Sequence, residues 1–131
     1  TEKYAGILLA HKHLLALRHN AYDTTRGLQG NSTALFHAND DNCVIGYHRW
    51  DKGGAGDDVL VIVNFSDQHF DTYDINLPLP GRWHVRFNSS WHGYSKDFRG
   101  VHLLSVSTHK NNTATITLPP YGVYILSQEV A

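Results

Sequence analysis

The stretch Val59-Leu60-Val61-Ile62-Val63-Asn64-Phe65-Ser66 decides the fold of this chain. It is a run of β-branched and aliphatic residues closed by Asn and Ser, and its length and composition predict a strand buried on both faces. A second strand is expected at residues 43–50. The loop between them, residues 51–58, is dense in glycine and aspartate, which form turns. Together these segments predict a hairpin at the centre of an antiparallel sheet, flanked by the remaining strands.

The rest of the chain alternates short β-prone runs with turn-forming residues. Many short strands at regular spacing predict a mainly β fold, an antiparallel sandwich or barrel, and we expect a β-sandwich with Greek-key-like connections. The further expected strands are residues 33–38, 70–77, 82–87, 101–107, 113–118 and 121–128.

Residues 1–20 predict one N-terminal α-helix ahead of a β-sandwich domain at residues 21–131. Apolar residues recur there at helical spacing, Thr1 is a candidate N-cap, and basic residues gather toward the C-terminal half, where the helix dipole favours them. The helix carries more leucine than one small sheet needs. We therefore expect part of its apolar surface to belong to a neighbouring domain that is missing from this chain.

The composition indicates one ordinary globular domain. A chain of 131 residues that is 41% hydrophobic and 18% charged has the length for a real core. Its formal net charge of -1 provides no electrostatic footprint for nucleic acid or an anionic membrane. The sequence has no apolar run long enough to span a bilayer and no signal-peptide pattern. We therefore expect neither nucleic acid nor membrane as a partner.

The chain has one cysteine, Cys43, and no methionine. A single cysteine excludes an intrachain disulfide and favours a reducing, cytoplasmic location, but many secreted β domains also lack disulfides, so secretion stays open. Four Asn-x-Ser/Thr patterns carry little weight because such short patterns arise by chance. A chain without an initial methionine has lost a leader or is a piece of a longer protein, and we expect the second.

The carboxylates of the sequence do not form a catalytic pair. Glycoside hydrolysis needs two carboxyls across the substrate, but Glu2 and Glu129 lie near opposite ends of the chain. The aspartates are mostly in loops, where we expect solvated, turn-forming side chains. Asp71 and Asp74 share an expected strand but are three residues apart, which predicts opposite faces. We therefore predict no catalytic residue.

Metal, cofactor and nucleophile motifs are also missing from the sequence. The ten histidines show no metal-ligand spacing. Asp57 and Asp58, with the carbonyls of the glycine loop, are weak candidates for Ca²⁺, but EF-hand spacing is absent. Cys43 begins an expected strand, which predicts an inert core residue. The glycine loop is followed by a strand, which fits a hairpin turn and not a nucleotide site. We therefore expect no metal and no cofactor.

Aromatic residues are the remaining candidates for binding. Trp83 lies in an expected strand and is predicted to be core. Trp91, Tyr94 and Trp50 are candidates for stacking on a sugar ring, because an exposed aromatic ring offers a flat apolar face. The alternative for Trp91 is burial, either capping the sandwich or against another domain.

Seven phrases carry a family resemblance, in this order: the leucine-rich segment Tyr4–Arg18, then Thr25–Leu28, Val44–Asp51, Gly53–Val59, Val63–Ser66, Pro80–Ser89 and Pro120–Gln128. They resemble the C-terminal end of α-amylase-family enzymes, glycoside hydrolase family 13. Within this family, the phrases most resemble those of the 1,4-α-glucan branching enzymes and their amylase-like relatives. The resemblance covers nearly the whole chain.

The resemblance implies a catalytic (β/α)₈ barrel followed by an all-β C-terminal domain, with this chain as the latter. The opening helix is similar to the last helix of such a barrel, which would explain its surplus leucine. None of the barrel's catalytic motifs is present, so no catalytic residue carries over. His84, His92 and residues 101–110 match no fixed family pattern, and they leave the subfamily open.

The first functional hypothesis is a non-catalytic domain that packs on and stabilises the barrel of an α-glucan-acting enzyme and adds a contact to glucan. It predicts an exposed apolar patch on the helix. The alternative is a free-standing carbohydrate-binding module, which predicts coplanar exposed aromatics. A third hypothesis, a small β-sandwich enzyme, is disfavoured by the inventory of carboxylates.

Overall fold

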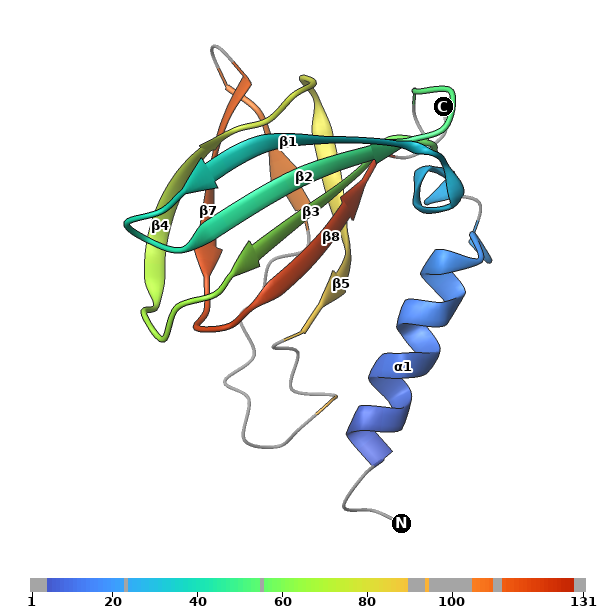
Figure 1. The fold of residues 1–131 in the computed structure, drawn as a ribbon, viewed down its shortest axis with the longest axis horizontal. Helices are drawn as coiled ribbons and strands as arrows, with labels where there is room; N and C mark the ends of the chain where they lie inside the picture. The colour runs from blue at the N-terminus through green and yellow to red at the C-terminus, as the bar shows by residue number, and fades with distance from the viewer. Residues whose placement is uncertain are drawn as a thin grey trace.

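The computed structural model describes residues 5–22, 24–54, 56–89, 94, 105–109 and 112–128. Figure 1 shows the described chain as a β-sandwich with one α-helix beside it. The elements are α1 (Ala5–Arg18), the 3₁₀ helix η2 (Arg26–Gln29), β1 (Ser32–Asn39), β2 (Val44–Trp50), β3 (Val59–Asn64), β4 (Phe70–Asn76), β5 (Arg82–Asn88), β6 (Ser105–Ser107), β7 (Thr113–Leu118) and β8 (Val123–Ser127).

The strands form two antiparallel sheets. The larger sheet has the order β1-β2-β3-β8-β5-β6, and the smaller one pairs β4 with β7. The chain leaves the large sheet after β3, and β8 later inserts between β3 and β5, so the connections are Greek-key-like. The hairpin of β2 and β3 is confirmed, with β3 near the middle of the sheet. The predicted fold class is therefore confirmed.

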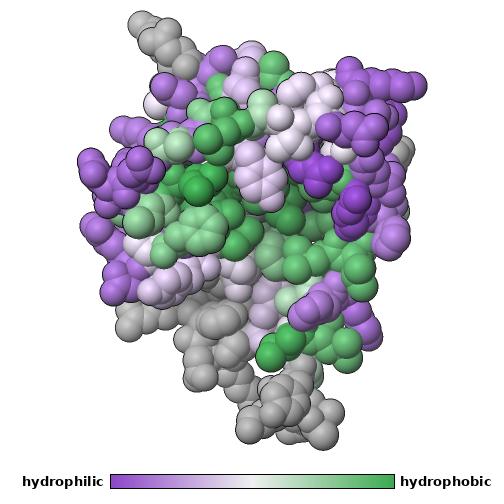
Figure 2. All heavy atoms as spheres, viewed as in Figure 1, coloured by the Kyte–Doolittle hydropathy of each residue, from purple (hydrophilic) through white to green (hydrophobic). Residues whose placement is uncertain are grey.

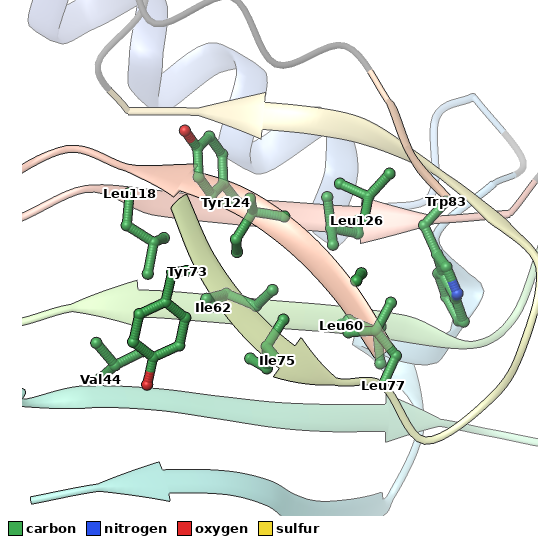
Figure 3. Packing of buried hydrophobic residues seen from close by; sticks show 13 residues of the cluster. Val44, Leu60, Ile62, Tyr73, Ile75, Leu77, Trp83, Leu118, Tyr124 and Leu126 are labelled. Carbon is green, nitrogen blue, oxygen red and sulfur yellow. The ribbon is translucent and has the colours of Figure 1, made fainter. Parts of the chain in front are cut away.

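The main core lies between the two sheets. Alternate residues of β3 and β8 point inward and meet the buried face of β4 and β7, as the two-residue period of strands requires. Trp83 is fully buried, which confirms that prediction, and its indole N–H donates to the carbonyl of Leu79 at 3.3 Å. Figure 3 shows ten labelled side chains of this core: Val44, Leu60, Ile62, Tyr73, Ile75, Leu77, Trp83, Leu118, Tyr124 and Leu126.

A second apolar cluster covers the opposite face of the large sheet. Val59 and Val61 alternate with Leu60 and Ile62, and all four are buried. The prediction that this strand is buried on both faces is therefore confirmed. The second cluster lies beneath α1 and η2 and consists of Leu17, Leu28, Val59, Val61, Phe87 and Ile125.

Two boundaries of the expected strands are wrong for the same reason. Cys43 is an exposed turn residue with φ 57°, not an inert core residue at the start of a strand. The last strand begins at Val123 rather than at residue 121, because Tyr121 has φ 54°. Both residues adopt the left-handed backbone conformation, which ends a turn. Their side chains are of types common in strands, so the sequence did not indicate this backbone conformation.

The aspartates of β4 are both exposed. Strict alternation would place Asp71 and Asp74 on opposite faces, but the register of β4 against β7 shifts between Phe70 and Tyr73. The expected strand at residues 101–107 is described only from Ser105 onward, and residues 1–4 of the expected helix lie outside the described residues.

Candidate functional site

Helix α1 presents two different sides. Gly6, Ala10, His13 and Leu17 recur every three or four residues, so they share one side of the helix. This side lies against the sandwich, since Leu17 is buried and a Cβ on Gly6 would lie 1.5 Å from the carbonyl oxygen of Tyr94. Only glycine fits at this approach.

The other side of α1 carries exposed aliphatic residues, with the exposed His11 and Arg18 among them. Ile7, Leu8 and Leu15 are 58%, 57% and 57% exposed, and Leu14 is 37% exposed. At 100° per residue these four side chains occupy a single arc that the sandwich does not cover. Figure 2 shows apolar residues along the helix and over the centre of the visible sheet face, with polar residues at the rims. The predicted apolar patch on the helix is present.

A polar network centred on the buried Thr25 fastens the C-terminal end of α1 to the segment that follows it. Thr25 is fully buried, and its hydroxyl donates to the carbonyl of Leu17 at 2.7 Å. The backbone N–H of Thr25 donates to the side-chain oxygen of Asn20 at 2.9 Å. The guanidinium of Arg18 donates to the carbonyl of Leu28. These bonds connect the helix to the turn that follows it.

Helix η2 docks in turn on the loop between β2 and β3. The backbone N–H of Gly27 donates to the carbonyl of Asp57 at 2.8 Å, and Arg26 Nε lies 2.7 Å from Asp57 Oδ2. A Cβ at Gly27 would lie 2.2 Å from the carbonyl oxygen of Asp57. The two backbones therefore approach each other closely only because residue 27 is glycine.

The buried carboxylates of Asp57 and Asp58 organise this loop, so the prediction that loop aspartates are solvated is wrong for both. Asp57 accepts the backbone N–H groups of Asp51 at 2.7 Å and Lys52 at 3.1 Å as well as Arg26. Burial by itself raises the pKa of Asp57, but these hydrogen bonds outweigh it and lower the pKa to about 2.

Asp58 has a different set of partners. His48 Nε2 lies 2.8 Å from Asp58 Oδ1, and the backbone N–H of Gly54 donates to Asp58 Oδ2 at 2.7 Å. N–H donors thus occupy the carboxylate oxygens that a Ca²⁺ ion would need. Among the described residues, no group of three or more His, Cys, Asp or Glu side chains is placed to hold a metal ion.

The sugar-stacking candidates lie in different places. Trp50 is half-buried and stacks on His48 with ring centroids 4.5 Å apart. Tyr94 packs on the opposite side of the sheet, where its ring lies 5.6 Å from that of Phe87 and its hydroxyl 2.5 Å from His13 Nδ1. Burial first, and then the nearby Tyr22, raise the pKa of Tyr94. The third candidate, Trp91, lies outside the described residues.

Sequence reasoning missed three exposed aromatic residues, Tyr22 and two residues in turns next to β3 and β8. Phe65 is 59% exposed and Tyr121 is 66% exposed. Phe65 was assigned to the central strand, and Tyr121 to the last strand, so neither was considered for binding. Turn formers flank both positions, and these were the only local signal.

Comparison with known proteins decides the family. The family model described as alpha amylase, C-terminal all-beta domain, matches residues 36–129. The chain belongs to this family. The match begins within β1, after η2, and extends past the end of β8.

Curated relatives of this C-terminal all-beta domain are much longer proteins. The chain is 32% identical over 94 residues to the 1,4-alpha-glucan branching enzyme GlgB of Pseudomonas fluorescens (strain Pf0-1), covering 68% of this chain and 12% of that protein. It is 34% identical over 97 residues to the GlgB of Frankia casuarinae, covering 69% of this chain and 12% of that protein. The chain thus spans about an eighth of these relatives.

A solved structure shares the fold. The alpha-amylase from H. orenii superposes with a TM-score of 0.56 at 17% identity, over 93% of this chain and 20% of that one. Within the described residues of the C-terminal all-beta domain, no helix is long and apolar enough to be a candidate membrane span.

Proposed function

We propose that this chain is the non-catalytic C-terminal β-sandwich domain of an α-glucan-acting enzyme of the α-amylase family, a branching enzyme or an amylase. Its role is to pack on the catalytic (β/α)₈ barrel of the same protein and stabilise it. The family match and the much greater length of the branching enzymes that resemble it support the assignment. The observation that best supports this stabilising role is the set of exposed aliphatic side chains on α1.

The physical argument starts from the way α1 is held. Leu17 packs one side of the helix on the sandwich, and the buried hydrogen bond from Thr25 to its carbonyl fixes the end of the helix, so the helix cannot turn its exposed leucines inward without losing both. Burying a whole leucine stabilises by about 1.5–3 kcal/mol, so covering four partly exposed aliphatic side chains is worth roughly 4 kcal/mol. A protein surface that covers α1 supplies this burial.

The test is a titration of this chain against a branching enzyme from which both the all-β domain and the helix that corresponds to α1 have been removed. Wild-type chain is expected to bind and to raise the melting temperature of the barrel. The double variant Leu8→Glu, Leu15→Glu should bind at least ~100-fold more weakly, which corresponds to about 3 kcal/mol. Both positions are exposed, so the variant should fold.

The matched control is Leu35→Glu on β1. Leu35 is 62% exposed, but β1 is the edge strand farthest from β5, the strand against which α1 packs. This control should bind the barrel as the wild type does. Equal binding by the double variant and the wild type would refute the proposed role.

Three further expectations remain predictions. The chain alone should show no turnover of α-glucan, since the sequence holds no catalytic pair. Contact with glucan through Trp50, Tyr94 or Trp91, which would also characterise the alternative of a free-standing carbohydrate-binding module, is tested by titration with maltoheptaose. A cytoplasmic location stays a prediction from the single cysteine.

A further inference from the structure

Three hydrogen-bonded side chains join the two sheets at one end of the sandwich. His37 Nε2 on β1 lies 2.6 Å from the hydroxyl of the buried Tyr73 on β4, and the two rings meet edge to face with centroids 5.6 Å apart. The side-chain NH₂ of Asn39, also on β1, donates to the same hydroxyl at 3.1 Å. Figure 3 shows this hydroxyl directed from β4 toward the strands of the large sheet, beside Val44. Within the part of the chain that the structure describes, no other hydrogen bond links β1 to β4.

A β-bulge in β1 turns His37 toward the core. In the ladder with β2, Leu35 pairs with Tyr47 and His37 pairs with Gly46, so Phe36 is an extra residue between the two pairs. Without the extra residue, His37 would share the outer face of Leu35, because side chains alternate along a strand. Gly46 leaves room for the Phe36 ring, since a Cβ there would lie 2.7 Å from it. The bulge therefore places His37 between the sheets.

The hydrogen bonds determine which atoms carry protons. The backbone N–H of Asn42 donates to the side-chain oxygen of Asn39 at 3.1 Å, so Asn39 directs its NH₂ group at the Tyr73 oxygen. The O–H of Tyr73 then needs an acceptor of its own, because an unpaired hydroxyl is costly when buried. His37 Nε2 is the acceptor within hydrogen-bonding distance. His37 is therefore neutral, with its proton on Nδ1.

The charged groups of the large sheet and its turn do not pair with His37. On the inner face of β2, the titratable side chain is His48, which lies 2.8 Å from Asp58. Tyr47 and Arg49 alternate with it and lie on the outer face. The turn between β1 and β2 carries two exposed aspartates, Asp40 and Asp41.

On β4, Tyr73 is the titratable group that faces His37. The two carboxylates of this strand, Asp71 and Asp74, are both exposed, and Asp71 lies 3.0 Å from His69. Across the described residues, His37 has no ion pair that would favour its charged form. Burial lowers the pKa of His37 from its ordinary value of 6.5.

We propose that His37 is an acid-sensitive lock between the two sheets: the neutral ring accepts the Tyr73 hydroxyl and holds β1 on β4, and the protonated ring releases this end of the sandwich. A protonated imidazole carries N–H groups on both nitrogens, so Nε2 cannot accept. The Tyr73 oxygen would then face two donors, and its O–H would lose its acceptor. The lock lies at the end of the sandwich away from α1 (Figure 1), so it does not depend on the proposed function.

The sign of the pH dependence follows from the direction of the pKa shift. Because the pKa of His37 is lowered in the fold, the lock contributes its full stability above pH 6.5 and loses it as the pH falls below that value. A histidine of ordinary pKa 6.5 that stays neutral in the fold raises the unfolding equilibrium constant about eightfold between pH 7 and pH 5.5.

The first measurement is an NMR titration of the His37 ring nitrogens in the isotope-labelled full chain, together with amide hydrogen exchange. At pH 8 the proton should be on Nδ1, and the ring should gain its second proton clearly below pH 6.5. Between pH 7.5 and pH 5.5 the amides of residues 36–39 should lose protection, after correction for the intrinsic exchange rate. The amide of Gly27, which is bonded to Asp57 at the opposite end of the sandwich, should keep its protection.

The second measurement is urea unfolding of wild type and His37→Gln at pH 7 and pH 5.5. Glutamine places a neutral oxygen near the position of Nε2, so it can accept the Tyr73 hydroxyl without titrating. Over this range the unfolding constant of the wild type should rise about threefold to eightfold more than that of the variant. The matched control is His69→Gln, at an exposed histidine just before β4, which should follow the wild type within about twofold.

Tyr73→Phe tests the lock if His37→Gln does not fold. It keeps the buried ring and removes the hydroxyl, so the amides of residues 36–39 should be equally protected at pH 7.5 and pH 5.5. Three results overturn the lock: a proton on Nε2 at pH 8, the same pH response in wild type and His37→Gln, or an acid loss of protection that persists in Tyr73→Phe.

Discussion

The buried charge of Asp57 makes a measurable contribution to stability. Its carboxylate accepts two backbone N–H groups and the Arg26 side chain, and its pKa is about 2 against an ordinary value of 3.8. This difference corresponds to about 2 kcal/mol of folding free energy. Because the pKa is lowered in the fold, the contribution is fully present above pH 4 and is lost as the pH falls from about 4 through about 2. Roughly half of it is left at pH 3.

The assay is urea unfolding of wild type and Asp57→Asn at several pH values. At pH 7 the variant should be less stable by about 2 kcal/mol or somewhat more, because the asparagine NH₂ also faces the N–H donors of the loop. The difference in stability between wild type and Asp57→Asn should narrow as the pH is lowered to 3, because the stabilisation from the charged carboxylate of the wild type declines there. Asp71→Asn, at a side chain that is 93% exposed, should change stability by less than ~0.5 kcal/mol.

Comparing Asp57→Asn with Asp71→Asn separates the effect of the Asp57 carboxylate on stability from the general acid sensitivity of the protein. Asp57→Asn within ~0.5 kcal/mol of wild type at pH 7 would refute the view that this charge organises the loop. A large difference in stability between wild type and Asp57→Asn that stays constant from pH 7 to pH 3 would show that the variant is destabilised by altered hydrogen bonding and not by loss of the charge.

Two further predictions concern packing. Trp83→Ala removes the largest fully buried side chain and should lower the free energy of unfolding by about 3–5 kcal/mol in urea, whereas Trp50→Ala at a half-buried ring should cost clearly less; equal losses would contradict the assignment of the core. Gly27→Ala places a Cβ 2.2 Å from the carbonyl oxygen of Asp57 and should lower the free energy of unfolding in urea by about 1–3 kcal/mol, while Gln29→Ala, an exposed change in the same short helix, should leave it nearly unchanged. A Gly27→Ala protein as stable as wild type would show that η2 can move away from the hairpin loop.

Local chemistry was enough to predict the strands. The run from Val59 to Asn64 combines β-branched residues with a length that suits a central strand, and the glycine loop before it supplies the turn. The alternation of residues 113–118 is visible in the sequence in the same way, and it matches the burial of Ala114, Ile116 and Leu118 in the core. Such patterns act between near neighbours, so they are visible in the sequence. The sequence also showed that α1 has more leucine than one sheet needs, because helical spacing indicates which apolar residues lie on different sides of a helix.

Tertiary structure alone decided the features that depend on distant partners. Asp57 is typical of a turn, and it is buried only because η2, some 30 positions earlier, closes over the loop. Likewise, Asn64 and Pro119 are 55 positions apart, and it is the insertion of β8 beside β3 that lets the buried Asn64 side chain donate to the carbonyl of Pro119. The sequence determined which segments are strands and that the helix has an apolar side to spare. Which polar groups become buried and which aromatics stay exposed follow from contacts between segments, because burial depends on what covers a side chain and not on its neighbours in sequence.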